Sequence, residues 1–262
     1  VYARSPFRRL YVQAAAGDAG GAIGAALVAW QRVEGGKRSG AGAARSPMTH
    51  AYYGPEYTDA QIGAAIDARK AEIDGQKCSV TRVTDEKPLI QKTAKAIADG
   101  AVVGWFQGRM EWGPRALGNR SIVCDPRRAD MKELLNAKIK RRESFRPFAP
   151  SILREAVAEW FETDDDVPFM MQVYPIRPEK RALIPAVTHV DGSGRLQTVT
   201  RESNPRYYAL IEAFRALSGV PMVLNTSFNE NEPVVCRPEE ALGCFLRTKM
   251  DVLVMGNWFV SR

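Results

Sequence analysis

Two arginine-rich segments within residues 104–150 constrain the fold of this chain more than any other feature. The first follows a short apolar run at residues 101–106 and alternates glycines with arginines: Gly108, Arg109, Gly113, Arg115, Gly118 and Arg120. The second places five cations around a single acid: Lys138, Lys140, Arg141, Arg142, Glu143 and Arg146. Glycine lets the backbone approach a ligand closely, and the planar arginine fork matches phosphate or carboxylate. Two such segments that converge would form a pocket for a small, multiply charged anion.

A solvated basic face is the alternative interpretation, and the neighbouring residues argue against it. Apolar side chains are interleaved with the cations and would pull them against a core: Trp112, Leu117, Ile122, Phe145 and Phe148. Three prolines also stiffen these segments: Pro114, Pro147 and Pro150. A purely solvated charge run needs no such rigidity. The sequence therefore favours a buried anion site.

Composition narrows the class of partner. The 262 residues carry a formal net charge of +7, which indicates anionic partners. The cations cluster with glycine and proline in loops and lack a nucleic-acid-reading signature, so small phosphorylated substrates fit better than nucleic acid. No apolar run approaches the length of a membrane span. The four cysteines show no CxxC spacing, which predicts free thiols in a reducing cytoplasm rather than a zinc cluster.

Four ordered segments between residues 81 and 255 carry a family resemblance. QGRMEWGPRALGNRSI (107–122), KRRESFRPFAPSIL (140–153), THVDGSGRLQTV (188–199) and PMVLNTSFNENEP (221–233) resemble signature segments of one carbamoyltransferase family. That family includes the nodulation and tobramycin O-carbamoyltransferases. The resemblance implies an α/β fold of the YrdC-like type, a twisted mixed sheet with helices and a concave, positively charged face. Asn231 and Glu232 depart from the family, which usually has a glycine before the Glu-Pro of this loop.

The N-terminal segment is similar to a different part of the same family. Asp18, Gly20 and Gly21 precede an apolar helical pattern, as in a turn that approaches a phosphate or a metal-bound nucleotide. A glycine-rich helix packed tightly on a sheet would give the same string. The resemblance is to the last motif of an actin-like (ASKHA) ATPase domain, in which this aspartate completes a divalent metal site, iron or magnesium, with two upstream histidines. Those histidines are not in this sequence, so Asp18 is an orphaned metal ligand.

The expected organisation has three parts. Residues 1–34 are expected to be the tail of the actin-like domain, residues 35–79 a linker with one helix, and residues 80–262 the YrdC-like domain. Helices are expected at residues 58–71, 89–97, 131–139, 156–161, 207–217 and 239–247, and strands at residues 101–106, 120–124, 169–174, 195–200, 222–224 and 252–255. Alternating helices and strands are typical of an α/β fold, and their order alone leaves a parallel or a mixed sheet open. The opening residues read as mid-domain sequence, so we expect a fragment of a longer protein.

The resemblance also implies an activity and its residues. Members of the family bind carbamoyl phosphate and ATP, form carbamoyl adenylate, and pass the carbamoyl group to the hydroxyl of a small acceptor. The catalytic residues carried over to this chain are Arg115, Lys140, Arg146 and Arg195. The residues carried over for substrate or nucleotide binding are Arg120, Ser121, Arg142, His189, Asn225, Thr226, Ser227 and Asn229, with Gly20 and Gly21 in the N-terminal part. Fixed cations and amides suit this chemistry because phosphoryl and acyl transfer depend on positioning and electrostatic stabilisation.

Several assignments stay open at this level. His189, close to Asp191, either polarises a substrate or is hydrogen-bonded within a turn. Glu111 and Glu143 are expected to pair with neighbouring arginines. Two rival functions also remain: a module that binds nucleic acid through the same basic face, and an inactive fragment. Salt dependence discriminates the first rival, because contacts to many phosphates weaken steeply with salt.

Overall fold

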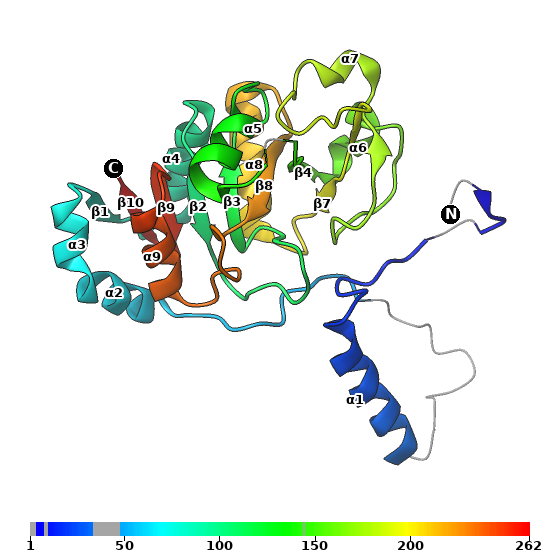
Figure 1. Cartoon of the computed structure of the whole chain (residues 1–262), viewed down its shortest axis with the longest axis horizontal. Coiled ribbons are helices and arrows are strands. Elements are labelled where there is room, and N and C mark those ends of the chain that lie inside the picture. Colours follow the sequence, from blue (N-terminus) through cyan, green and yellow to red (C-terminus); the bar gives the residue numbers. More distant parts are fainter. Residues whose placement is uncertain (1–3, 8–9, 34–47, 144) are drawn as a thin grey trace.

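The centre of the molecule is a mixed eight-stranded sheet with the order β1-β10-β9-β2-β3-β8-β4-β7 (Figure 1). The computed structural model describes residues 4–7, 10–33, 48–143 and 145–262. The strands of the sheet are Ser79–Arg82 (β1), Val103–Phe106 (β2), Arg120–Cys124 (β3), Ala149–Leu153 (β4), Gln197–Val199 (β7), Met222–Ser227 (β8), Val252–Met255 (β9) and Trp258–Ser261 (β10). Tyr174–Pro175 (β5) and Ser193–Gly194 (β6) form a second, two-stranded sheet. The α/β fold with a mixed sheet is confirmed.

Strand direction determines which loops meet at the site. β2 pairs parallel to β9 and antiparallel to β3, and β8 is antiparallel to both β3 and β4. β2, β8 and β9 therefore run in the same direction and end at the same edge of the sheet. β3 and β4 begin at that edge. The central strands β2, β3, β4 and β9 are buried along their whole length, whereas the edge strand β1 is exposed.

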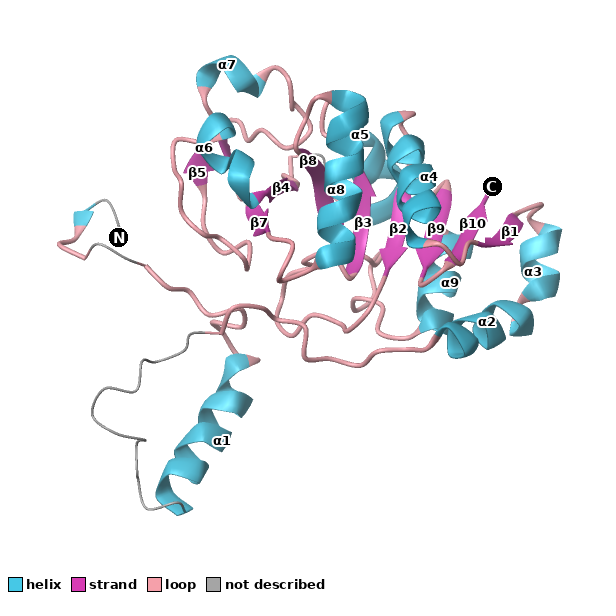
Figure 2. Cartoon of the chain, turned by 180° about the vertical axis from the view of Figure 1, so that it is seen from behind, coloured by secondary structure: helices cyan, strands magenta, loops and turns pink. Residues whose placement is uncertain are grey.

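Helices cover both faces of the sheet. Glu86–Ala98 (α4) and Pro205–Ser218 (α8) pack against each other on one face, and Pro238–Arg247 (α9) covers β2 and β9 on the other (Figures 1 and 2). The shorter helical segments are Met131–Leu134 (α5), the π-helix Leu135–Lys140, the 3₁₀ turn Arg154–Ala156, Val157–Trp160 (α6) and Pro178–Arg181 (α7). The π-helix ends at Arg141, which has a left-handed φ of 45°.

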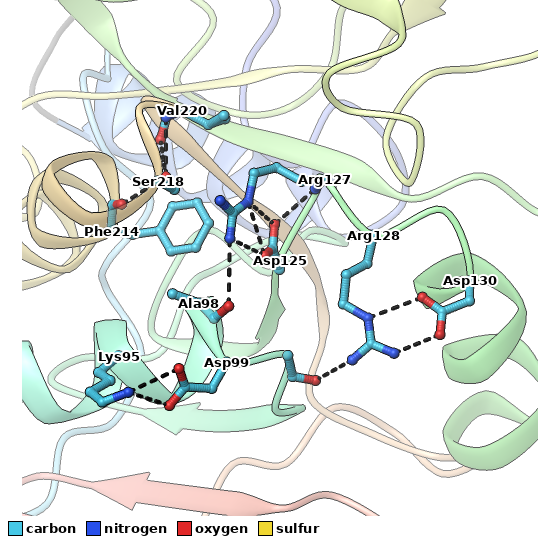
Figure 3. A network of polar contacts seen from close by, with 11 residues as sticks. Lys95, Ala98, Asp99, Asp125, Arg127, Arg128, Asp130, Phe214, Ser218 and Val220 are labelled. Carbon is cyan, nitrogen blue, oxygen red and sulfur yellow. Dashed lines mark hydrogen bonds and ion pairs between the residues drawn. The ribbon is translucent and has the colours of Figure 1, made fainter.

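The turn after β3 is fixed to the end of α4 by a polar network (Figure 3). The carboxylate of Asp125 accepts two-pronged hydrogen bonds from the Arg127 guanidinium, which also lies over the ring of Phe214 in α8. Arg128 donates to the Gly100 carbonyl at 2.8 Å and pairs with Asp130. Two-pronged arginine–carboxylate contacts hold geometry as well as charge. The network holds the turn that follows β3, at the edge of the sheet opposite to the candidate site.

The N-terminal helix Gly20–Val33 (α1) lies apart from the sheet and has no buried residue (Figure 1). The segment before it touches the body, since Ala14 and Ala15 are buried. Residues 34–47, which include much of the expected linker, lie outside the described residues, and Asp59–Ala68 (α2) and Lys70–Gly75 (α3) follow them. α2 packs on α9 and β10. The division of the chain into three parts stays a prediction.

Most expected elements are found, with one clear error. The strands at 120–124 and 252–255 have the expected bounds, and Thr58 caps α2 through a capping box with Gln61. The expected strand at 169–174 is wrong, because only Tyr174 belongs to β5. In that segment Phe169 and Met170 instead pack in a small cluster with Ala14, Ala51 and Leu117. An apolar run can be buried in a loop, and periodicity does not distinguish this from a strand.

Candidate functional site

Three arginines from separate parts of the sequence converge on one small cavity of about 100 Å³, here called the anion pocket. Its polar lining consists of Arg115, Arg142, Arg195, Asn225, Thr226 and Ser227. Arg115 comes from the loop between β2 and β3, Arg142 follows the π-helix, and Arg195 precedes β7. None of the described residues that line this pocket is acidic. The two arginine-rich segments therefore meet as the sequence predicts.

The guanidinium groups of the anion pocket are partly desolvated and repel one another. Burial lowers the pKa of Arg195 to about 10, and the positive charges of Arg115 and Arg142 contribute to this lowering. Burial and then Arg146 lower the pKa of Arg142. The Nε atoms of Arg115 and Arg195 are buried and have no hydrogen-bond partner among the described residues. Uncompensated, close-set cations are costly, and an anionic ligand would relieve that cost.

The last half of β8 supplies the amide and hydroxyl groups of the pocket. Asn225 is buried, and its Nδ2 donates to the Ala116 carbonyl at 3.0 Å and to Ser151 Oγ at 2.9 Å. Because a carbonyl only accepts, this contact fixes which way the amide points. Asn225 Oδ1 is buried without a partner in the described part of the chain. Asn225, a lining residue, thus leaves one acceptor unused beside the three cations.

The loop of residues 108–119, which carries Arg115, is held by a buried carboxylate. Glu111 Oε1 accepts from the backbone amides of Leu117 at 2.6 Å, Asn119 at 2.8 Å and Arg120 at 3.3 Å. The expectation that Glu111 pairs with an arginine side chain is wrong, since these contacts are to main-chain N–H groups. The partly solvated pair between Glu143 and Arg146, at 3.0 Å, is confirmed. Sequence reasoning missed the loop-anchoring role of Glu111.

Glycine is required at two turns of the same loop. Gly113 and Gly118 have φ values of 119° and 104°, a region that favours glycine. A Cβ at Gly118 would lie 2.1 Å from the ring of Tyr207, and one at Gly113 would lie 2.7 Å from the Ala14 carbonyl. The loop therefore packs against α8 on one side and the N-terminal segment on the other.

Lys140 is hydrogen-bonded to the end of β8 and to the residues that follow it. Its buried Nζ donates to the carbonyls of Ser227 at 2.5 Å and Asn229 at 2.8 Å, and to Asn229 Oδ1 at 2.7 Å. Burial, followed by the charge of Arg142, lowers the pKa of Lys140 to about 7. The structure therefore brings Lys140, Ser227 and Asn229 together, with Lys140 next to the anion pocket and outside its lining.

Arg120 and Ser121 do not reach the anion pocket. Arg120 is fully buried, and its guanidinium donates to the carbonyls of Gln107, Asn119, Pro55 and Gly108 while it stacks 3.7 Å from the Phe106 ring. Burial lowers its pKa to about 10. Ser121 Oγ accepts from the Gly118 amide at 3.0 Å. Both side chains hold the loop in place, and ligand binding by either stays a prediction.

Arg146 and His189 do not line the anion pocket. The side chain of Arg146 is 53% exposed and is paired with Glu143. Phe145 was expected to pack against the core and to draw the neighbouring cations inward. Its side chain is 73% exposed, so this expectation is wrong for Phe145. His189 Nδ1 lies 3.2 Å from Ser193 Oγ, whose hydroxyl donates to Asp191. His189 is half-buried, and burial lowers its pKa. These contacts support the interpretation that His189 is hydrogen-bonded within a turn.

The N-terminal candidates lie in or beside the turn that leads into α1. Asp18 is exposed, and Gly20 and Gly21 form the first residues of the helix. No cluster of three or more metal-ligating side chains occurs among the described residues, so the described surroundings of Asp18 do not fit a metal ion. No step of the chemistry below depends on this turn.

Further buried polar residues that hold the site were not predicted. Tyr52 OH and Gln197 Nε2 both donate to the Leu117 carbonyl at 2.8 Å, and Ser151 Oγ donates to Gln197 Oε1 at 2.6 Å. These partners are separated by 46 to 80 positions in the chain. Such pairings depend on the sheet register, and no local pattern in the sequence signals them.

Sequence similarity to known proteins covers nearly the whole chain. The profile of a family described as "Carbamoyltransferase C-terminus" matches residues 94–262. The nodulation protein NolNO of Sinorhizobium fredii is 45% identical over 98% of this chain and 36% of its own length. A 3'-hydroxymethylcephem-O-carbamoyltransferase of Amycolatopsis lactamdurans is 42% identical over 63% of this chain and 31% of its own length. The chain spans less than half the length of these relatives.

A solved structure aligns with part of the chain. Full-length HypF, in a phosphate- and nucleotide-bound form, aligns with a TM-score of 0.46 and 19% identity over 68% of this chain and 22% of HypF. Among the described helices, none combines the length and the apolar character that crossing a membrane requires.

Proposed function

This chain belongs to the carbamoyltransferase C-terminus family, and from that membership we propose that it serves ATP-dependent O-carbamoyl transfer. In the proposed sequence, carbamoyl phosphate and ATP give carbamoyl adenylate, and the carbamoyl group then passes to an acceptor hydroxyl. The name of the cephem-modifying relative supports a hydroxyl as the acceptor. The observation that carries the proposal is the anion pocket, in which three arginines surround about 100 Å³.

The proposed formation of carbamoyl adenylate consists of two successive displacement reactions. Water attacks the phosphorus of carbamoyl phosphate and breaks the P–O bond to the carbamoyl group, which leaves carbamate and inorganic phosphate. An oxygen of the carbamate then attacks the α-phosphorus of ATP, and pyrophosphate departs. Both displacements develop charge on phosphoryl oxygens, where fixed guanidinium groups stabilise it most effectively.

Different lining residues would contact the phosphoryl groups and the carbamoyl group. Arg115 and Arg195 each have an unpartnered Nε that would donate to phosphoryl oxygens, and Arg142 adds a third charge. The unused Oδ1 of Asn225 would accept from the NH₂ of a carbamoyl group. A methyl group in place of that NH₂ would leave the acceptor unpaired, so we expect weaker binding of acetyl phosphate than of carbamoyl phosphate.

The nucleotide needs more room than the anion pocket provides. Ligand-sized sites typically enclose about 300–1,000 Å³, several times the volume of this cavity. We therefore place only the reacting phosphoryl groups of ATP in the pocket, with the nucleoside outside it. Arg146, which is partly exposed and follows Arg142 in the same segment, would contact such an extended ligand.

Pyrophosphate release tests the proposal. The chain is expected to release pyrophosphate only when ATP and carbamoyl phosphate are both present, and Arg115→Ala is expected to lower the rate at least about 100-fold through the loss of one charge-assisted contact. Arg201→Ala removes an exposed arginine that is paired with Glu212 and serves as the matched control. Equal rates for Arg115→Ala and Arg201→Ala, or soluble folded protein that releases no pyrophosphate, would overturn the proposal.

A further inference from the structure

Arg141, which lies between two cationic residues of the site, has a backbone conformation that is unusual for its type. It follows Lys140, which is bonded to the end of β8, and precedes Arg142, which lines the anion pocket. The φ and ψ angles of Arg141 are 45° and 50°, in the left-handed region. A Cβ disfavours that region by roughly fivefold to thirtyfold in population, and glycine is the usual residue where a helix ends in this way. Such a conformation persists only where its surroundings hold it.

The left-handed turn determines how Arg142 leaves the π-helix. The carbonyl of Asn136 accepts hydrogen bonds from the backbone amides of Arg141 and, at 3.1 Å, of Arg142. Asn136 Oδ1 also accepts from Arg142 Nε at 2.8 Å, and the Arg142 guanidinium lies 4.9 Å from the centroid of the Phe148 ring. If residue 141 left the left-handed region, the Arg142 amide would turn away from Asn136. The placement of the Arg142 guanidinium therefore depends on the backbone of its neighbour.

A largely buried carboxylate holds the side chain of Arg141. Its Nε lies 2.8 Å from Glu230 Oε1, in the loop that follows β8. The Glu230 side chain is only 10% exposed, whereas that of Arg141 is 63% exposed. Ion pairs between two solvated side chains contribute little, but attraction is stronger where one partner is withdrawn from water. This pair can therefore offset the cost of the left-handed conformation.

The loop that carries Glu230 is itself anchored to α9. Arg247, in the last turn of that helix, donates to Glu232 Oε1 at 2.9 Å, and its Nε lies 3.9 Å from Glu230 Oε2. The Glu230 amide donates to Glu232 Oε1 at 3.3 Å, and Asn229 Nδ2 donates to the Glu232 carbonyl at 2.7 Å. Glu230 is thus a fixed point toward which the Arg141 side chain is drawn.

Two bridges join the segment of residues 140–142 to the loop after β8, and they act at different places. Lys140 Nζ donates to Asn229 Oδ1 at 2.7 Å, so this bridge holds the last residue of the π-helix against the loop. The pair of Arg141 with Glu230 acts on the residue whose backbone makes the turn. The first bridge therefore sets the position of the helix end, and the second sets the direction in which the chain continues.

We propose that Glu230 and Arg141 are positioning residues for the anion pocket. Their ion pair holds residue 141 in the left-handed conformation, and this conformation presents Arg142 to a phosphorylated ligand. Neither residue of the pair lines the pocket. The consequence for carbamoyl transfer rests on the proposed function, whereas the consequence for phosphate affinity does not.

Two substitutions of the same arginine separate backbone conformation from charge. Arg141→Ala and Arg141→Gly lose the charge and the ion pair alike, but only glycine adopts the left-handed conformation without cost. In calorimetric titrations of the folded variants with inorganic phosphate, Arg141→Ala is expected to bind at least about fivefold more weakly than Arg141→Gly.

Glu230→Gln tests the other partner with the opposite electrostatic sign. Loss of a nearby carboxylate would by itself favour an anion, yet this variant is expected to bind phosphate roughly fivefold more weakly than the wild type, because residue 141 is released. Added to Arg141→Gly, the same change is expected to cause no further loss, since glycine no longer needs the pair. The KM for carbamoyl phosphate in the pyrophosphate assay is expected to follow the same order.

Lys77 provides a matched control for the backbone effect. It also has a left-handed φ, of 58°, and it is exposed after the end of α3, outside the lining of the anion pocket. Lys77→Ala and Lys77→Gly are expected to bind phosphate equally, although the glycine variant is expected to be the more stable of the two in urea. A difference in affinity at Arg141 without one at Lys77 would locate the effect at the pocket.

The outcomes separate this inference from the proposed function. Phosphate affinities in the expected order without any pyrophosphate release would overturn the carbamoyl transfer and leave the positioning role intact. Pyrophosphate release by the wild type, together with equal phosphate affinities of Arg141→Ala and Arg141→Gly, would overturn the positioning role alone. Tighter binding by Glu230→Gln than by the wild type would show that the carboxylate acts through its charge and would also contradict the inference. No phosphate binding by the wild type would overturn both.

Discussion

At the scale of single residues, two buried charged groups shape the site without lining it. Lys140 Nζ holds the end of β8 through Ser227 and Asn229, and Glu111 holds the loop that carries Arg115. Lys140 thus contacts Ser227, which lines the pocket, whereas Glu111 contacts backbone amides of the loop whose Arg115 lines it. The contacts of both residues depend on the protonation state and the length of the side chain. Substitution or titration of either residue therefore tests its role.

Lys140 is expected to titrate near neutral pH. Burial lowers its pKa from 10.5 to about 7, so between these values the folded state binds fewer protons at this site than the unfolded state. The contribution of Lys140 to stability therefore rises as pH increases from about 7 to 10.5. NMR of labelled lysine Cε should show one group with a midpoint near 7 that disappears in Lys140→Met. A midpoint close to the ordinary lysine value for every lysine would contradict this prediction.

Glu111→Gln is expected to destabilise the fold and to loosen the anion pocket. All three backbone amides donate to Glu111 Oε1, and the uncharged amide oxygen of glutamine at that position is a weaker acceptor than a carboxylate oxygen. The expected loss is about 1–3 kcal/mol of unfolding free energy in urea, with weaker carbamoyl phosphate binding in calorimetry. Glu159→Gln, at an exposed carboxylate, is the control. Unchanged stability in Glu111→Gln would show that the loop is held by its other contacts.

At the scale of elements, the loop between β2 and β3 and the helix α8 are built against each other. Gly118 and Gly219 both have positive φ, at 104° and 74°. Only Gly118 faces an obstacle, since its Cβ would meet the Tyr207 ring, while nothing lies within 4 Å of a Cβ at Gly219, the C-cap of α8. These two glycines therefore separate backbone strain from loss of packing.

Gly118→Ala is expected to destabilise the protein far more than Gly219→Ala. Strain at a left-handed position costs about 1 kcal/mol, and displacement of the α8 packing adds roughly 1–3 kcal/mol. Urea unfolding of the two variants gives the comparison. Losses of equal size would mean that the Tyr207 ring moves aside at little cost, and that the loop does not depend on α8.

Local sequence patterns predicted elements better than they predicted contacts. The strands at 120–124 and 252–255 follow from apolar runs bounded by turn residues, and α9 follows from helical spacing. β4 was not predicted, because Pro147 and Pro150 are typical of a loop, although residues 149–153 pair with β7 and β8. Convergence of the arginines was predicted from their neighbours. The partners of Glu111 and Arg120 were not, since they depend on which loops meet at the sheet edge.

At the scale of the whole molecule, the net charge of +7 is distributed in two different ways. Many surface arginines are neutralised by nearby acids, as in the pairs Arg82–Asp59, Arg128–Asp130, Arg154–Asp164 and Arg201–Glu212. The arginines of the anion pocket instead face one another. Paired surface cations contribute little attraction at physiological salt, whereas close-set cations in a cavity keep theirs.

Salt dependence is therefore expected to distinguish a small-anion site from a nucleic-acid surface. Carbamoyl phosphate contacts few cations in a partly desolvated cavity, so its affinity should fall by less than about tenfold between roughly 50 and 200 mM salt. A surface that neutralises about six to ten nucleic-acid phosphates would lose about 10³–10⁵ in affinity over the same range. Calorimetry with carbamoyl phosphate and fluorescence anisotropy with a single-stranded RNA measure the two slopes.

Tight RNA binding with the steep slope, competed by carbamoyl phosphate, would mean that the arginines serve a nucleic-acid interface. A shallow slope that Arg115→Ala abolishes together with binding would instead locate the interaction in the anion pocket, where the charge is enclosed by Asn225 and Ser227.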